Sequence, residues 1–214
     1  MASQVAVDFT FDEDSHSYRV AGRDVPACSH VLSDGGLVNF SFVREDVLER
    51  KSELGREAHK ACHLYNIGKQ FTCDDAVKPY LNSWISFTER MNFRAELSEY
   101  RMIGSVNEMQ FGMQIDCMGL IRNEETIVEL KIGAVLPHHG LQLAGYAAGL
   151  YHPTLKTPLG RFRQRKRIVV RLQEDGSLAK IHRFDSMSDF DVFAAALFVS
   201  SWKKQNLKPY REKP

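Results

Sequence analysis

The sequence lacks several features that would place it in a specialised class of protein. Its four cysteines, scattered and without a CxxC pair, are Cys28, Cys62, Cys73 and Cys117. This pattern argues against a zinc site or an iron–sulfur cluster and is typical of reduced thiols in a cytosolic compartment. The longest apolar runs, 141–150 and 193–199, are far shorter than the roughly 20 residues that a membrane helix needs. Residues 1–14 are polar and acidic, which disfavours a signal peptide, so we expect a cytoplasmic protein.

An excess of charge of one sign is also absent. The chain has 28 lysine and arginine residues against 27 aspartate and glutamate residues, a formal net charge of +1. Nucleic-acid binding must therefore rest on a local basic patch rather than on the field of the whole protein. A hydrophobic content of 43% supports a sizeable core, and no repeat or flexible linker divides the 214 residues. We expect one domain over 1–214, with a strand and hairpin extension over 1–40 and a core over 41–214.

Hydrophobic periodicity predicts a mixed α/β sheet flanked by helices. Alternating apolar residues between turn residues predict strands, and apolar residues three or four apart predict helices. The expected strands are 8–11, 17–20, 24–27, 95–103, 112–122, 126–132, 167–172 and 178–184, of which the last two form a hairpin. The expected helices are 42–65, with Ser41 as its start cap, and then 74–91, 141–151 and 188–206.

The strongest chemical signal is a set of charged residues on two of these strands. Asp116 lies within a largely apolar strand, and Glu129 and Lys131 lie two residues apart on the next strand. Side chains alternate along a strand, so Glu129 and Lys131 share one face while Val128 and Leu130 point into apolar packing. Charges in such a setting are costly unless they are paired or bind a ligand.

Asp116 and Glu129 on neighbouring strands would lie within a few ångströms of each other. Two converging carboxylates offer the oxygen ligands that Mg²⁺ or Mn²⁺ prefers. Lys131 beside them would orient or activate a water, or hold a phosphate oxygen. The alternative is a structural ion cluster at a sheet edge.

Two of the expected helices carry further polar pairs. His59 and His63 are four residues apart and share one helical face, as do Gln142 and Tyr146. A histidine pair at this spacing can bind zinc, but neither a third soft ligand nor an HExxH pattern accompanies it. The alternative for both pairs is packing on ordinary amphipathic helices.

Taken together, these segments resemble the PD-(D/E)xK nuclease superfamily, and within it the RecB-like and phage-type exonuclease branch. That branch shows a GxxxH helix, a strand with glycine and aspartate, an (Asp/Glu)-x-Lys strand and a Gln-x-x-x-Tyr helix, in this order. The matching segments are 55–59, 112–116, 129–131 and 142–146, and residues 12–26 look like the lead-in strands of phage-borne members. Gly112 lies one residue further from Asp116 than in the compact Gly-x-x-Asp form. The three C-terminal cysteines of the iron–sulfur branch are missing.

The resemblance implies a restriction-endonuclease-like core and a Mg²⁺- or Mn²⁺-dependent deoxyribonuclease. Its expected role is that of an exonuclease in phage or prophage recombination, repair or replication, in a bacterial or phage-infected cell. The implied metal ligands are His59, Asp116, Glu129 and the backbone carbonyl of Leu130. Lys131 would position the attacking water, and Glu99 would assist the metal site, with Glu96 as its competitor. Gln142 and Tyr146 would orient the site or touch the DNA backbone.

The densest basic segment, 161–167, has five cationic side chains in seven positions. We expect a loop that grips DNA phosphates in a salt-sensitive manner, the alternative being a solvated loop. The candidate DNA contacts are Arg56, Lys60, Arg163, Arg165, Lys166 and Arg167. Since no helix-turn-helix or zinc finger is evident, we expect no sequence specificity.

Three functions are compatible with these residues. A metal-dependent DNA nuclease is favoured, because a module without catalysis has no reason to keep costly charges on apolar strands. The second is a non-catalytic DNA-binding module of the same fold. The third is an unrelated hydrolase with zinc on His59 and His63. A recombination partner protein or a homo-oligomer is compatible with the nuclease.

Overall fold

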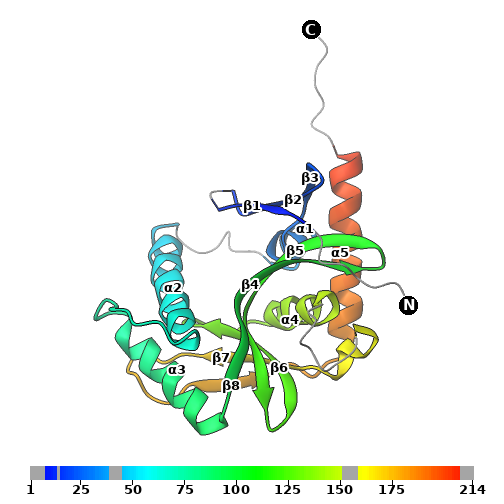
Figure 1. The fold of residues 1–214 in the computed structure, drawn as a ribbon. Helices are drawn as coiled ribbons and strands as arrows, with labels where there is room; N and C mark the ends of the chain where they lie inside the picture. The colour runs from blue at the N-terminus through cyan, green and yellow to red at the C-terminus, as the bar shows by residue number, and fades with distance from the viewer. Residues whose placement is uncertain (1–7, 14, 39–44, 151–158, 208–214) are drawn as a thin grey trace.

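The computed structural model describes residues 8–13, 15–38, 45–150 and 159–207, and their strands form two sheets (Figure 1). The smaller sheet, called here the N-terminal meander, is antiparallel and has the order β1 (Thr10–Asp12), β2 (Ser17–Val20), β3 (Arg23–Val25). The larger sheet has the order β4 (Arg94–Val106), β5 (Met109–Ile121), β6 (Glu124–Lys131), β7 (Lys166–Arg171), β8 (Lys180–Arg183). Its strands pair antiparallel except β6 and β7, which are parallel.

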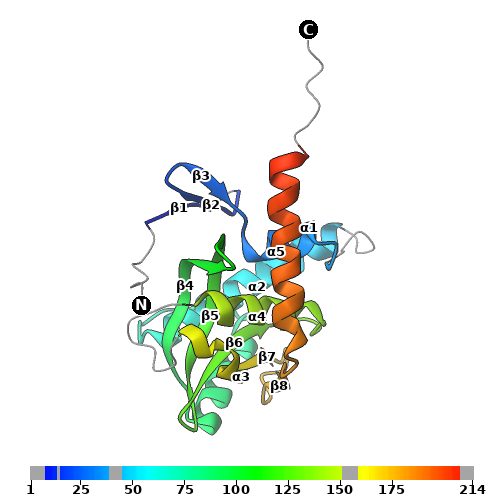
Figure 2. The ribbon, with the colours of Figure 1, turned by 90° about the vertical axis from the view of Figure 1, so that its right-hand side faces the viewer.

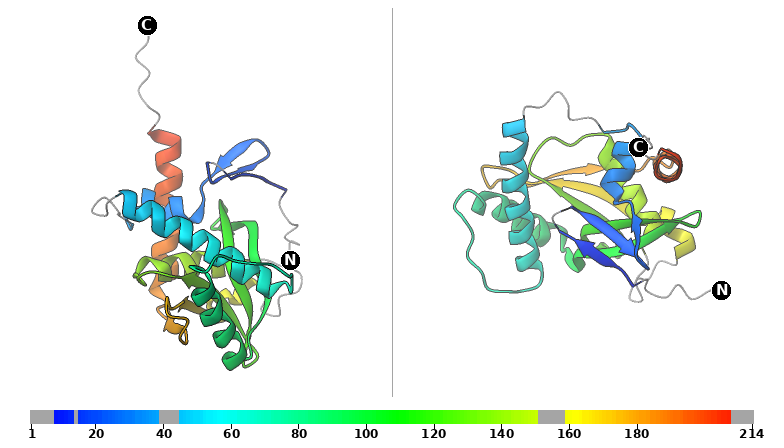
Figure 3. Two further views of the ribbon diagram at one scale, coloured as in Figure 1. Left: turned by 90° about the vertical axis from the view of Figure 1, so that its left-hand side faces the viewer. Right: turned by 90° about the horizontal axis from the view of Figure 1, so that it is seen from above.

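Helices cover both faces of the larger sheet. They are α1 (Cys28–Asp34), α2 (Glu45–Asn66), α3 (Lys78–Met91), α4 (His138–Gly149) and α5 (Ser188–Asn206), with a 3₁₀ helix at Leu159–Gln164. Because parallel neighbours need a crossover connection, the chain passes through α4 between β6 and β7. Seen from above, α2 and α5 lie on opposite sides of the molecule (Figure 3). No helix in the described residues is long and apolar enough to cross a membrane.

The predicted mixed sheet flanked by helices is confirmed, as is the hairpin of β7 and β8. The helix α1 was not predicted, and residues 74–77 form a turn rather than the start of α3. The start cap predicted at Ser41 lies outside the described residues. The prediction of a loop over 161–167 is wrong, because 159–164 form the 3₁₀ helix and β7 begins at Lys166.

Two hydrophobic cores lie on either side of the sheet, as the alternation of the strands requires. Ile127 and Val169 face one core, where they pack with α1, α4 and α5. Val128 and Leu130 face the other, where they pack with α2 and α3 around the fully buried Trp84. Figure 2 shows α5 running along the first side, over α4 and beside α1.

The larger sheet forks in its middle. The β5–β6 ladder ends at the pair Cys117–Val128, while β6 continues beside β7 as far as Lys131. Beyond the fork, β5 stays paired with β4, and the two strands curve away from β6 toward the N-terminal meander (Figure 1). The fork leaves Asp116 and Glu129 at the mouth of an opening between the two halves of the sheet.

A glycine anchors the meander to the curved half of the sheet. Gly112 on β5 donates its N–H to the carbonyl of Pro26 at 2.8 Å and forms a parallel bridge with Ala27. The buried ring of Tyr18 lies against Gly112 so closely that a Cβ there would overlap it. Gly112 therefore serves the close approach of the meander to β5.

Candidate functional site

A cleft of about 770 Å³ lies at the fork of the sheet. Its walls come from α2, the curved strands β4 and β5, the N-terminal meander and the end of β6 with α4. Six of the residues predicted for the site line it: His59, Glu99, Asp116, Glu129, Lys131 and Gln142. Tyr146, Arg56 and Lys60 line it as well.

His59, Glu99 and Asp116 form a compact cluster in this cleft. Their ligand atoms all lie within 4.8 Å of one another. His59 Nδ1 is 3.5 Å from Glu99 Oε1 and 3.5 Å from Asp116 Oδ1. The three come from α2, β4 and β5, so the tertiary fold assembles the cluster. Glu96, the competitor of Glu99, is exposed and lies beside Arg94 and Arg122 in a different hollow.

The backbone of Leu130 ties this cluster to β6. Past the end of the β5–β6 ladder, the N–H of Leu130 donates to Asp116 Oδ2 at 2.8 Å. The carbonyl of Leu130 accepts from His59 Nε2 at 3.1 Å. This second contact fixes the imidazole so that Nδ1 faces the carboxylates, the arrangement usual for a histidine that binds a metal. The metal-ligand role implied for the Leu130 carbonyl stays a prediction.

Glu129 is the centre of a second polar group. Its Oε1 accepts from Lys131 Nζ at 2.5 Å and from Gln142 Nε2 at 2.9 Å. Gln142 also contacts Tyr146 Oη at 2.8 Å. Lys131, Gln142 and Tyr146 are thus gathered around Glu129, which itself lies outside the cluster of His59, Glu99 and Asp116.

The charges of the two groups influence one another strongly. Burial disfavours a charge on His59, but Asp116 and Glu99 outweigh burial and raise its pKa to about 10. Burial acts against ionised Asp116, yet His59 and Lys131 hold its pKa below the usual value. Burial and the charge of Asp116 raise the pKa of Glu129 to about 7. His59 and Lys131 therefore balance the acidic groups at neutral pH.

The donor set of the cleft fits a hard divalent cation. Glu99 Oε1 and Glu129 Oε2 are buried and accept no hydrogen bond from any described residue. A buried carboxylate oxygen without a hydrogen bond is costly, so we expect a water or a cation beside these two atoms. Carboxylate oxygens with one imidazole nitrogen suit Mg²⁺ or Mn²⁺. Binding of such a cation at His59 Nδ1 would release the Nδ1 proton to solvent.

Glu99 sits in an unusual backbone conformation. Its φ of 47° lies in the left-handed region, in the middle of the strand β4. For a residue other than glycine this conformation costs free energy, so it persists only where the surrounding structure enforces it. Here Gln114 Nε2 donates to Glu99 Oε2, and His59 lies against Oε1. Neither the conformation nor Gln114 was predicted, because no motif in the sequence marks them.

His63 takes part in a packing network rather than in the cluster of His59, Glu99 and Asp116. Its Nδ1 lies 3.0 Å from Ser98 Oγ, which also accepts from Asn66 at 3.1 Å. Asn66 Oδ1 in turn accepts from the buried Trp84 at 2.9 Å. This network favours the packing interpretation of the pair at 59 and 63 over a shared zinc ion.

The predicted DNA contacts divide into three groups. Arg56 and Lys60 lie on α2 and line the cleft. Arg163 and Lys166 are about half exposed, outside the cleft, and pair with Asp191 at 3.2 Å and Glu124 at 3.6 Å, respectively. Arg165 and Arg167 form the third group and are buried inside the protein.

The prediction that Arg165 and Arg167 grip DNA is corrected by the structure. Their side chains are only 1% and 3% exposed. Arg165 pairs with Glu125 at 3.4 Å and donates to the carbonyl of Ala147 at 2.7 Å. Arg167 pairs with Asp189 at 3.0 Å. Both guanidinium groups are buried and paired with carboxylates inside the protein, so they cannot reach a DNA phosphate.

Comparison with known proteins gives little. No family model matches the sequence, and no curated protein matches it. Among solved structures, the chain is similar in part to the one described as the crystal structure of SSO0001, with 19% sequence identity and a TM-score of 0.37 over 61% of this chain. The chain spans 59% of the length of that protein. A similarity at this level supports no conclusion about the function of this protein.

Proposed function

We propose that this protein is a divalent-metal-dependent deoxyribonuclease of the PD-(D/E)xK type, with a restriction-endonuclease-like core, and that it acts as an exonuclease on linear DNA. The observation that carries the proposal is the convergence of His59, Glu99 and Asp116 within 4.8 Å, beside the Glu129–Lys131 pair. Chain order supports it too, because His59, Asp116, Glu129 and Lys131 fall in the segments that resemble the superfamily. The working setting would be phage or prophage recombination, repair or replication.

Asp116, Glu99 and His59 Nδ1 would hold the cation. Glu129 Oε2, a buried carboxylate oxygen without a hydrogen bond from a described residue, would be a further ligand. A bound Mg²⁺ or Mn²⁺ would supply Lewis acidity at the scissile phosphate and a nucleophile at neutral pH. The carboxylates are held in advance: Leu130 fixes Asp116, Gln114 fixes Glu99, and Gln142 fixes Glu129. Such preorganisation lowers the cost of assembling the reacting groups.

Lys131 is the group best suited to act on the attacking water. Its side chain is 27% exposed, and Nζ lies 2.5 Å from Glu129 Oε1 in the wall of the cleft. Glu129 raises the pKa of Lys131 above its usual value against the opposing effect of burial. Charged Lys131 can therefore orient a water or hold a phosphate oxygen through its N–H donors. Arg56 and Lys60 on α2 would neutralise neighbouring phosphates.

Cleavage of end-labelled linear DNA and covalently closed circles, with Mg²⁺, Mn²⁺ or EDTA, tests the proposal. We expect metal-dependent loss of linear DNA only, abolished in Lys131→Ala. Lys180→Ala is the matched control, because Lys180 is an exposed lysine on β8 that does not line the cleft. Mn²⁺ binding to Asp116→Asn, measured by calorimetry, should be weaker than to the unmodified protein.

Other outcomes separate the alternatives. Cutting of closed circles would identify an endonuclease using the same site. DNA binding without cleavage under any metal would refute the catalytic proposal and leave a binding module. Tight zinc binding that survives Asp116→Asn, again without cleavage, would favour the unrelated hydrolase.

A further inference from the structure

A polar stripe extends along the curved half of the sheet from the cluster of His59, Glu99 and Asp116, called here the candidate metal cluster. Glu99 and Arg101 lie two residues apart on β4, and Gln114 and Asp116 lie two residues apart on β5. Residues two apart share one face of a strand, and Arg101 pairs directly with Gln114 in the register. All four residues line the cleft. The stripe leads from Asp116 toward the N-terminal meander.

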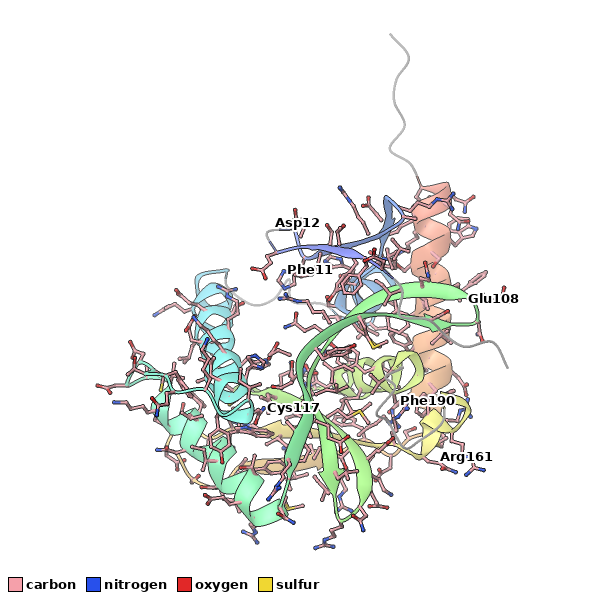
Figure 4. All side chains as sticks on the ribbon, viewed as in Figure 1. Phe11, Asp12, Glu108, Cys117, Arg161 and Phe190 are labelled. Carbon is pink, nitrogen blue, oxygen red and sulfur yellow. The ribbon has the colours of Figure 1, made fainter. Side chains whose placement is uncertain are left out.

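Arg101 is held in a defined orientation at the far end of this stripe. Its Nε donates to Gln114 Oε1 at 2.8 Å, and its guanidinium lies 4.3 Å from the ring centroid of Phe11. Figure 4 labels Phe11 on the meander, above the curved strands. Since Gln114 also contacts Glu99, one amide links the guanidinium to the candidate metal cluster.

The remaining partner of Arg101 is a carboxylate that can be exchanged at little cost. Its Nη1 lies 3.3 Å from Glu13 Oε1. The side chain of Glu13 is 76% exposed and that of Arg101 36% exposed. A solvent-exposed pair of this kind contributes about 0–1 kcal/mol. Glu13 makes a single contact of 3.3 Å with Arg101, whereas a phosphate can accept two parallel hydrogen bonds from one guanidinium, so a phosphate in that geometry would bind Arg101 better.

The distribution of charge gives Arg101 a distinct place in the cleft. Arg56 and Lys60 supply positive charge from α2, on one wall. On the wall formed by β4, β5 and the meander, the acidic Glu99 and Asp116 oppose the approach of a DNA strand, an effect that the neighbouring charged His59 reduces when no cation is bound. Among the residues that the structure describes, Arg101 is the arginine that lines this wall. Two strand residues span about 6.6–6.8 Å, which is comparable to the separation of adjacent phosphates along a DNA strand.

We propose that Arg101 binds the DNA phosphate next to the scissile one, displacing Glu13. The N-terminal meander would orient the Arg101 guanidinium for this contact through the ring of Phe11. The inference rests on the proposed function, because it names a contact within the same cleft. Arg101 acts as a binding and positioning residue. The side of the meander that faces the cleft, lined by Glu13, His16 and Tyr18, is then part of the DNA-binding surface, whereas Arg19 does not line the cleft.

Binding of a fluorescein-labelled 20-base-pair duplex, followed by anisotropy in EDTA over a range of salt concentrations, tests the inference without relying on cleavage. We expect Arg101→Ala to weaken binding roughly threefold to tenfold and to reduce the salt slope by about 0.9, the value for one lost phosphate contact. Arg19→Ala is the matched control, because Arg19 lies on the meander, is 60% exposed and does not line the cleft. It should change neither quantity.

A second variant keeps the test decisive if Arg101→Ala folds poorly. Glu13→Gln removes only the competing charge of an exposed side chain, and we expect it to tighten duplex binding about twofold to fivefold with the salt slope unchanged. A set of duplexes with one neutral methylphosphonate at successive positions locates the contact. The unmodified protein should lose affinity at one position, where Arg101→Ala shows no further loss.

The failures of the two proposals are distinguishable. If Arg101→Ala keeps the affinity and salt slope of Arg19→Ala, or if its losses are equal at every methylphosphonate position, the role of Arg101 is refuted. If the binding results hold but no metal supports cleavage, the nuclease proposal falls and the Arg101 contact stands.

Discussion

The buried Arg165 offers the sharpest test of how the basic segment 161–167 is used. The structure gives Arg165 a role in the fold, since its guanidinium pairs with Glu125 and donates to the carbonyls of Ala147 and Leu150 at the end of α4. Arg163, two residues earlier, is 49% exposed and pairs with Asp191, which is 75% exposed. Replacing each by alanine compares a buried and an exposed arginine within one segment.

The expected magnitudes differ clearly. Removing one partner of a buried ion pair costs about 3–5 kcal/mol, because a charge is left in a poorly solvated place. The lost bonds to the end of α4 add about 1 kcal/mol. Against a typical total stability of about 5–15 kcal/mol, Arg165→Ala should be severely destabilised. Arg163→Ala should lose about 0–1 kcal/mol, as exposed pairs do.

Urea denaturation followed by circular dichroism measures both free energies of unfolding. The double variant Arg165→Met with Glu125→Leu removes both charges and should recover part of the loss. Duplex binding by any folded Arg165 variant should keep the salt slope of the unmodified protein. Equal losses of stability in the Arg165 and Arg163 variants, or a salt slope that falls while stability is retained, would refute the structural role of Arg165.

Two further predictions concern the meander and the first turn of α4. Gly112→Ala should lose about 1–3 kcal/mol of stability, since its Cβ would overlap Tyr18; Gly133→Ala, which meets nothing within 4 Å, is the control in the same urea assay. Burial and nearby positive charges lower the pKa of His139 to about 3, so between pH 6.5 and that value only the unfolded chain takes up its proton. The free energy of unfolding should therefore fall as pH falls, by about 2 kcal/mol from pH 6.5 to 5. His139→Asn keeps an acceptor for the backbone N–H that His139 Nδ1 binds and should flatten this dependence, whereas the exposed His30→Asn should leave it; an unchanged slope in His139→Asn would contradict the assignment.

Local patterns were sufficient where the physics is local. The period-two alternation of β6 predicts that Glu129 and Lys131 share a face and that Val128 and Leu130 face the other core, and the structure confirms it. The four-residue spacing of Gln142 and Tyr146 likewise predicts their contact on α4. In both cases the two residues lie on one strand or one helix, so the period of that element is sufficient to predict that they share a face.

Contacts between segments far apart in the sequence could not be predicted from such patterns. The left-handed backbone of Glu99 and the contacts of Gln114 and Arg101 depend on the curvature of β4 and β5 and on the docking of the meander. Arg165 shows the opposite error, because a run of cations predicts a solvated or DNA-binding segment. Arg165 lies just before β7, and its burial depends on partners such as Glu125, forty residues earlier in the sequence.

The fork of the sheet explains why charged residues can occupy so apolar a place. Where the β5–β6 ladder ends, the N–H and the carbonyl of Leu130 lose their strand partners, and Asp116 and His59 replace them. An interrupted ladder would otherwise leave buried backbone groups unsatisfied at a cost of about 1–3 kcal/mol each. The same two side chains that could hold a cation therefore stabilise the opening in the sheet. Asp116 consequently has a structural role before any ligand arrives, and the cleft exists because the strands part at that residue.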